Sequence, residues 1–242
     1  MLRGAALAAL IVVGLGAAAA PARGDETVDA AIVLAADVSR SIDDDEFTLQ
    51  RRGYAAAIVS DKLMEAIHSG PHGAIALAYV EWAGEGEQTI VVDWMVLRNS
   101  TDAAKFAAAL TASPRSFLGR TAIGAALDFA MGLFAEGGIA IDRKVIDVSG
   151  DGTSNQGRAV TEARDAAVKA GAVINGLSIF NRRAAASGGY LALHTNPPGG
   201  LAKYYRDNVI GGLGAFVLPI DDFGKFGDAM IRKLTAEIAS NE

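Results

Sequence analysis

The chain has 242 residues, no cysteine and a formal net charge of −6 at pH 7. The absence of cysteine excludes a disulfide framework, a thiolate metal site and a cysteine nucleophile. No run of basic residues offsets the acidic balance, and this argues against nucleic acid as a partner, because proteins bind nucleic acids through clustered lysines and arginines.

The amino terminus has the pattern of an export signal. A positive start, "MLRG", precedes the apolar run "AALAALIVVGLGAAAA", and "APA" at 20–22 forms a small-residue cleavage site. We expect residues 1–22 to be a signal peptide and residues 23–242 to be one exported domain, in the periplasm or outside the cell. A retained membrane anchor is the weaker alternative, since the apolar run is shorter than the roughly 20 residues that span a bilayer. We expect no membrane span in the mature chain.

Short apolar segments alternate with segments of helical period along the rest of the chain. The apolar runs that predict buried strands are 29–37, 74–84, 88–97, 143–150, 172–180 and 214–220, with the second and third joined as a hairpin. Capping residues and helical spacing predict helices from Asp43 onward and over 100–110, 121–136, 157–171 and 221–239. Residues 181–212 are less regular.

This alternation predicts an α/β fold, a doubly wound and mostly parallel sheet with helices on both faces and one antiparallel edge strand. In the last helix, an apolar stripe indicates packing on the sheet; its members are Phe223, Phe226, Met230, Ile231, Leu234 and Ile238.

Oxygen-bearing side chains follow two predicted strands and precede one helix. Asp37, Ser39 and Ser41 come directly after the first strand, Thr121 stands before a helix, and Asp151 follows "KVIDVSG". Ligands gather beyond the carboxyl ends of the strands in such a sheet. These hard oxygen donors favour Mg²⁺ over Zn²⁺, which prefers nitrogen or sulfur. The sequence therefore predicts a divalent-cation site.

The same segments carry a resemblance to a known family. "DVSRS" resembles the D-x-S-x-S signature of von Willebrand factor type A (VWA) domains, and "GRTAIGAAL" at 119–127 is similar to the threonine loop of that family. "SGDG" at 149–152 occupies the place of its strand-end T-D-G. The resemblance spans roughly residues 30–240, and its wording is typical of a secreted bacterial branch of unknown function.

The resemblance implies a metal-ion-dependent adhesion site. Ser39 and Ser41 would coordinate the ion through their hydroxyls, Thr121 would coordinate or approach it, and Asp37 and Asp151 would act mostly through ion-bound water. The ion would be Mg²⁺, or Mn²⁺ or Ca²⁺, with one position open for an acidic side chain of a protein or peptide partner. A glycine at 150 replaces the usual threonine, which puts the hydrogen bonding of Asp151 in question.

Simpler explanations exist for several of these residues. Ser41 with Asp44, or Asp43 with Glu46, could cap the following helix. The acidic run 43–45 fits a solvated first helical turn better than a second metal site. Asp147 lies inside an apolar strand, and we expect it to make a structural hydrogen bond and not to act at the ion.

The remaining candidates show no ligand spacing or binding pattern. The three histidines lack ligand spacing, and we expect them on the surface or in loops; they are His68, His72 and His194. Trp82 and Trp94 fit packing in the core or at the sheet edge.

These observations favour an exported, metal-ion-dependent binding or adhesion module over an enzyme. The mature chain has no G-x-S-x-G elbow, Walker loop or G-x-G-x-x-G motif, and its predicted topology places no histidine near the oxygen cluster. A phosphorylated Asp37 would call for a second aspartate at position 39, which is serine. Two alternatives stay open: a metal-dependent hydrolase or phosphatase-like enzyme using the same oxygens, and a metal-stabilised structural subunit of an envelope complex.

Overall fold

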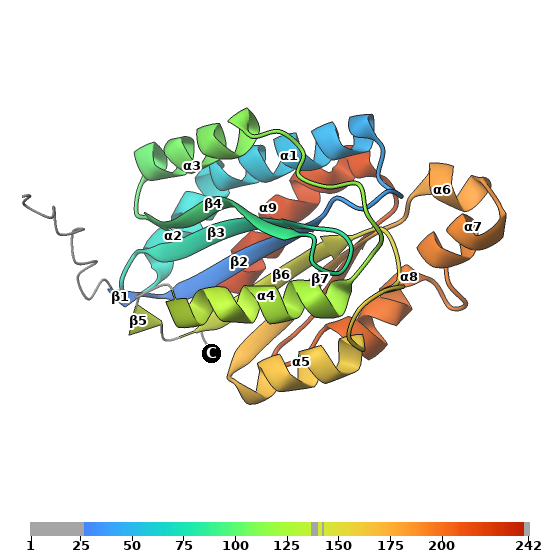
Figure 1. Ribbon diagram of the computed structural model, residues 1–242. Coiled ribbons are helices and arrows are strands. Elements are labelled where there is room, and N and C mark those ends of the chain that lie inside the picture. The colour runs from blue at the N-terminus through green and yellow to red at the C-terminus, as the bar shows by residue number, and fades with distance from the viewer. Residues whose placement is uncertain (1–26, 137–139, 142, 240–242) are drawn as a thin grey trace, which may run out of the picture.

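The computed structural model describes residues 27–136, 140–141 and 143–239, so the expected signal peptide lies outside the described residues. A six-stranded sheet with the order β4-β3-β2-β6-β7-β8 forms the centre (Figure 1). Its strands are β2 (Ala30–Asp37), β3 (Ile75–Trp82), β4 (Gln88–Leu97), β6 (Lys144–Gly150), β7 (Ala172–Ile179) and β8 (Val217–Ile220). A separate pair joins β1 (Thr27–Val28) to β5 (Ala140–Ile141).

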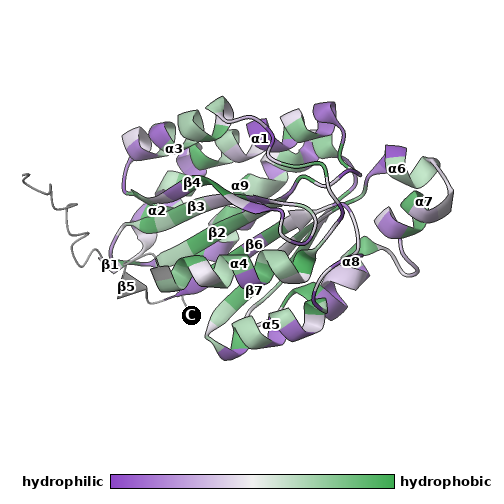
Figure 2. Ribbon diagram, viewed as in Figure 1, coloured by the Kyte–Doolittle hydropathy of each residue, from purple (hydrophilic) through white to green (hydrophobic). Residues whose placement is uncertain are grey.

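The topology confirms the predicted fold class. Every neighbouring pair of strands in the large sheet is parallel except β3 and the edge strand β4, which are antiparallel. The central strand β2 is buried along its whole length, with alternate side chains entering two separate apolar clusters. Strands buried on both faces are apolar on both parities, and Figure 2 shows the apolar colouring of the sheet.

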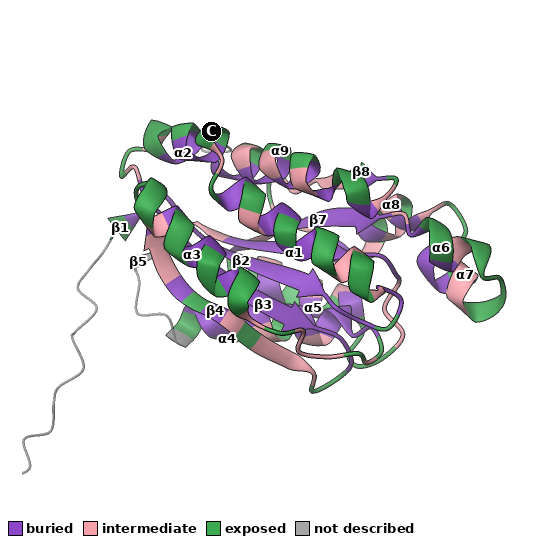
Figure 3. Cartoon of the chain, turned by 90° about the horizontal axis from the view of Figure 1, so that it is seen from above, coloured by how far each residue is buried: buried purple, intermediate pink, exposed green. Residues whose placement is uncertain are grey.

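Helices cover both faces of the sheet. The helices α1 (Asp44–Ile58), α2 (Asp61–Ser69), α3 (Ser100–Ala112) and α9 (Phe226–Ala239) pack against one face. The helices α4 (Ile123–Glu136) and α5 (Val160–Lys169) pack against the other. Their outer sides are exposed and their inner sides are buried (Figure 3). The apolar stripe of the last helix packs into the first cluster as expected, after a 3-10 turn, η2 (Phe223–Lys225).

The segment 181–212 is more regular than its sequence suggests. It forms short helices α6 (Arg182–Ala186), α7 (Gly189–Thr195) and α8 (Leu201–Tyr204), followed by a π-helix, η1 (Tyr205–Val209). Gly188 (φ 74°) and Gly200 (φ 84°) occupy the caps of α7 and α8 in left-handed conformations that glycine adopts without strain. Helices α6 and α7 lie beyond the carboxyl end of the parallel strands (Figure 1).

The other buried polar and aromatic candidates support the core. Asp147 forms an ion pair with Lys233 of α9 (Oδ1 to Nζ, 2.7 Å), and both side chains are fully buried. Trp82 is buried, while the indole of Trp94 donates to the Leu133 carbonyl at 3.2 Å. Among the described residues, no helix is long and apolar enough to cross a bilayer.

Candidate functional site

The five oxygen-bearing residues come together at the carboxyl end of β2 and β6. Asp37 ends β2, Ser39 and Ser41 lie in the following turn, Asp151 directly follows β6, and Thr121 lies two residues before the start of α4. Because β2 and β6 are adjacent and parallel, their ends lie side by side. All five side chains are buried.

A chain of short contacts links these side chains. The Ser39 and Ser41 hydroxyl oxygens are 3.3 Å apart, and the Thr121 hydroxyl donates to Ser39 Oγ at 3.3 Å. Ser41 donates to Asp151 Oδ1 at 2.5 Å, and Asp37 Oδ1 accepts from the Ser39 amide at 2.7 Å. Two carboxylates and three hydroxyls thus share one buried cluster.

The surroundings of the cluster do not compensate the charges that two ionised carboxyl groups would carry. Asp37 Oδ2 is buried and has no hydrogen-bond partner in the described part of the chain. Burial and then the neighbouring Asp151 raise the pKa of Asp37 from 3.8 to about 8. Burial also raises the pKa of Asp151, to about 6, although hydrogen bonds from Ser41 and Asn181 oppose this shift.

These residues fit a hard divalent cation. Hydroxyl and carboxylate oxygens are the ligands that Mg²⁺, Mn²⁺ and Ca²⁺ prefer, and a cation would compensate the two buried carboxyl groups. Among the residues that the structure describes, no cluster of three or more His, Asp or Glu side chains suits a metal ion. The hydroxyls of Ser39, Ser41 and Thr121 are therefore needed to complete the donor set.

Helix capping and the oxygen cluster use different side chains of the same turn. Asp43 caps α1, accepting from the Glu46 amide at 2.8 Å, while the Glu46 carboxylate accepts from the Asp43 amide at 2.9 Å. Asp44 and Asp45 are exposed in the first turn of α1. The alternative of a capping role for Ser41 is wrong, because its hydroxyl donates to Asp151 instead.

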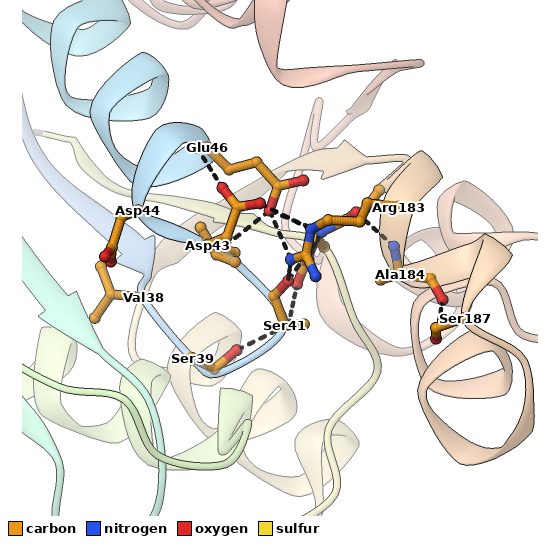
Figure 4. A network of polar contacts seen from close by, with 12 residues as sticks. Val38, Ser39, Ser41, Asp43, Asp44, Glu46, Arg183, Ala184 and Ser187 are labelled. Carbon is orange, nitrogen blue, oxygen red and sulfur yellow. Dashed lines mark hydrogen bonds and ion pairs between the residues drawn. The ribbon is translucent and has the colours of Figure 1, made fainter.

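Two residues that the sequence analysis missed complete the site from α6 and its start. Asn181 donates to Asp151 Oδ2 at 2.7 Å and to the Ser41 carbonyl at 3.0 Å. Arg183 donates to the same carbonyl at 2.7 Å and pairs with Asp43 and Glu46 (Figure 4). Asn181 lies just beyond β7, the strand beside β6, so its position at a strand end was the available signal.

Arg115 also holds the turn that carries the two serines. Its Nη2 donates to the carbonyls of Val38 (2.8 Å), Ser39 (3.0 Å) and Ile42 (2.8 Å). Three backbone acceptors on one guanidinium fix the path of the turn and so the positions of the serine hydroxyls.

His194 of α7 corrects a sequence-based prediction. Only 6% of this residue is exposed, with Nε2 3.2 Å from Thr121 Oγ1 and Nδ1 3.2 Å from Thr153 Oγ1. Burial lowers its pKa. The expectation of a surface or loop histidine is wrong because spacing in the sequence cannot reveal the packing of α7 on the site. His68 and His72 are exposed as expected.

The surroundings of Gly150 explain why glycine stands where the family usually has threonine. A Cβ on Gly150 would lie 2.5 Å from the Tyr205 hydroxyl and 2.9 Å from Asp37 Oδ2. The Tyr205 hydroxyl is buried and has no hydrogen-bond partner in the described part of the molecule. The missing side chain therefore gives a tyrosine of η1 access to the Asp37 side of the cluster, while Asn181 and Ser41 hold Asp151.

A cavity of about 530 Å³ opens next to the cluster. It reaches two of the cluster's hydroxyl residues and is walled by α7 and by the loops around positions 40 and 120; lining residues include Ser41, Thr121, Arg40, Arg120, Tyr190 and His194. The rings of Tyr190 and His194 are stacked at 5.8 Å with 8° between their planes. The buried hydroxyls thus adjoin a space large enough for a small ligand or part of a peptide.

A comparison with protein-family models gave a match. A family model described as "Protein of unknown function (DUF1194)" matches residues 27–242. A search of curated proteins gave no match.

Three solved structures share the fold at low sequence identity. Proximal thread matrix protein 1 from the mussel byssus, with a zinc-occupied MIDAS motif, has a TM-score of 0.59 and 19% identity over 88% of this chain and 46% of that chain. A von Willebrand factor type A structure from Catenulispora acidiphila has a TM-score of 0.59 and 17% identity, and the match covers 89% of this chain and 44% of that chain. The pilus adhesin SpaC from Lactobacillus rhamnosus GG has a TM-score of 0.59 and 15% identity, and the match covers 90% of this chain and 30% of that chain. The chain thus has a VWA-like fold and spans less than half of these structures.

Proposed function

The chain belongs to the DUF1194 family, and we propose that it is an exported, metal-ion-dependent binding module that engages an acidic group of a protein or surface partner. The buried cluster of Asp37, Ser39, Ser41, Thr121 and Asp151 carries this proposal. The three hydroxyls would hold the ion, and the two carboxyl groups would balance its charge. Bound there, the ion would supply an electrophilic centre for a carboxylate oxygen.

The arrangement around the cluster supports binding from outside. The cavity reaches Ser41 and Thr121, so a ligand can approach the hydroxyl side of the cluster without displacing a helix. The carboxyl groups are held on the inner side, where Ser41 and Asn181 contact Asp151. A zinc-occupied MIDAS motif and a pilus adhesin among the similar folds support the same type of site. Export rests on the amino-terminal pattern, with residues 23–242 as the mature domain.

Binding of the single-aspartate peptide acetyl-Gly-Gly-Asp-Gly-Gly-amide, measured by calorimetry, tests this function. We expect binding in Mg²⁺ that disappears with a chelator and in the Asp37→Ala variant. Asp45→Ala is the matched control, because Asp45 is an exposed carboxylate of the same segment, and it should bind normally. Peptide binding that survives both chelation and Asp37→Ala would exclude a metal bridge.

The position of His194 favours one second candidate, a metal-dependent hydrolase. A buried imidazole whose Nε2 lies 3.2 Å from Thr121 Oγ1 places a general acid or base beside the cluster, which the sequence analysis did not foresee. Hydrolysis of p-nitrophenyl phosphate in Mg²⁺ and Mn²⁺ separates the two functions. We expect no turnover above that of Asp37→Ala; turnover that His194→Ala abolishes would establish the enzyme instead.

A further inference from the structure

Two exposed arginines line the cavity beside the oxygen cluster. Arg40 lies between Ser39 and Ser41, and Arg120 directly precedes Thr121, so each is attached to a backbone segment that carries a cluster hydroxyl. Both are exposed, and across the residues that the structure describes neither side chain forms an ion pair or a hydrogen bond.

The other arginines around the site are occupied. Arg115 binds the backbone of the turn, and Arg183 pairs with Asp43 and Glu46. Arg51, further back, pairs with the buried Glu81. In a chain with a net charge of −6, two guanidinium groups that no described carboxylate pairs with give the mouth of this cavity a locally positive character. Such a patch attracts and orients an anionic ligand.

We infer that the cavity selects a peptide segment with two acidic side chains. One carboxylate meets the ion and the second pairs with Arg40 and Arg120; this inference rests on the proposed function. Guanidinium groups bind carboxylates through paired, charge-assisted hydrogen bonds. The stacked Tyr190 and His194 also line the cavity, and Tyr190, which is 65% exposed, offers an apolar ring face to the peptide between its two acids.

A peptide fits these features better than an acidic polysaccharide. The cavity volume of about 530 Å³ accommodates a few residues but not an extended polymer. A peptide also places its second acid at a distance set by its sequence, which lets the arginines discriminate between partners.

Calorimetry in Mg²⁺ tests the inference with the single-aspartate peptide and with peptides in which zero to three glycines separate two aspartates. We expect the best two-aspartate peptide to bind about tenfold more tightly than the single-aspartate peptide. The double variant Arg40→Gln/Arg120→Gln should lose this advantage, so that it binds the two-aspartate and the single-aspartate peptides with equal affinity. Arg52→Gln, which removes an exposed arginine of α1, is the matched control and should keep the advantage.

Each other outcome has a distinct meaning. Equal affinity for both peptide classes, or an advantage that persists in the double variant, overturns the selectivity while the proposed function stands. No Mg²⁺-dependent binding of either class overturns both. Tighter binding of trigalacturonate than of any two-aspartate peptide would assign the cavity to an acidic saccharide and contradict the inference.

Discussion

Replacing Asp37 by asparagine should stabilise the metal-free protein and abolish its response to Mg²⁺. Asp37 Oδ2 is buried without a hydrogen-bond partner in the described structure, and the second carboxyl group, Asp151, lies in the same cluster. Asparagine keeps the acceptor for the Ser39 amide, which Asp37 Oδ1 now contacts at 2.7 Å. It removes the ionisable group that only a cation would compensate.

The raised pKa of Asp37 sets the magnitude. This pKa is about 8 in the fold against an ordinary value of 3.8. A carboxyl group with a raised pKa destabilises the fold above pH 3.8, because the unfolded chain releases its proton more readily. At about 1.4 kcal/mol per pKa unit, the cost at pH 7 is on the order of 4 kcal/mol. Replacing Asp37 by asparagine removes this cost. The buried side-chain amide of the variant lacks some hydrogen-bond partners, and this costs roughly 1–3 kcal/mol, which offsets part of the stabilisation.

Urea and thermal unfolding of wild type and Asp37→Asn in a chelator measure this gain. We expect a free energy of unfolding higher by about 1–3 kcal/mol, and a Tm higher by roughly 2–12 °C for a chain of this size. With saturating Mg²⁺ the wild type should gain stability and Asp37→Asn should not. Asp45→Asn is the control and should match the wild type in both conditions. A metal-free Asp37→Asn that is less stable than wild type would refute the reasoning.

Three further predictions follow from the same site. Since ion binding must displace protons from Asp37, Mg²⁺ should raise the Tm more at pH 8.5 than at pH 5.5, and equal increments would contradict the role of this carboxyl. Gly150→Ala should lower the free energy of unfolding by about 1–3 kcal/mol through overpacking. Adding Tyr205→Phe to this variant should recover part of the loss, because the hydroxyl 2.5 Å from the new Cβ is gone. Additive losses in a double-mutant cycle would disprove the contact. Arg115→Ala should weaken Mg²⁺ binding about tenfold in calorimetry by freeing the turn that carries Ser39, and an unchanged affinity would show that the turn is rigid without it.

Local sequence patterns were enough to predict the sheet and the main residues of the cluster. The apolar runs at β2 and β6 define two buried parallel strands, and the carboxyl end of such strands is where their following residues must meet. Asp37 and Asp151 are placed by this rule alone. Thr121, in the loop before α4, needed the family resemblance as well.

The residues of segment 181–212 that contact the site were not predictable in the same way. Helices α6, α7 and α8 are only 5, 7 and 4 residues long, too short to display a periodic apolar stripe. Asn181, Arg183 and His194 reach the site because this segment folds over the strand ends, which is a matter of tertiary packing. For this reason, the prediction that no histidine lies near the oxygen cluster is wrong.

Anomalous diffraction at the manganese edge, from crystals of the protein grown with Mn²⁺, tests the central claim most directly. The account predicts one strong peak within coordination distance of the hydroxyl oxygens of Ser39, Ser41 and Thr121, absent from crystals of Asp37→Ala. A peak at another place, or none at this cluster at saturating Mn²⁺, would contradict it.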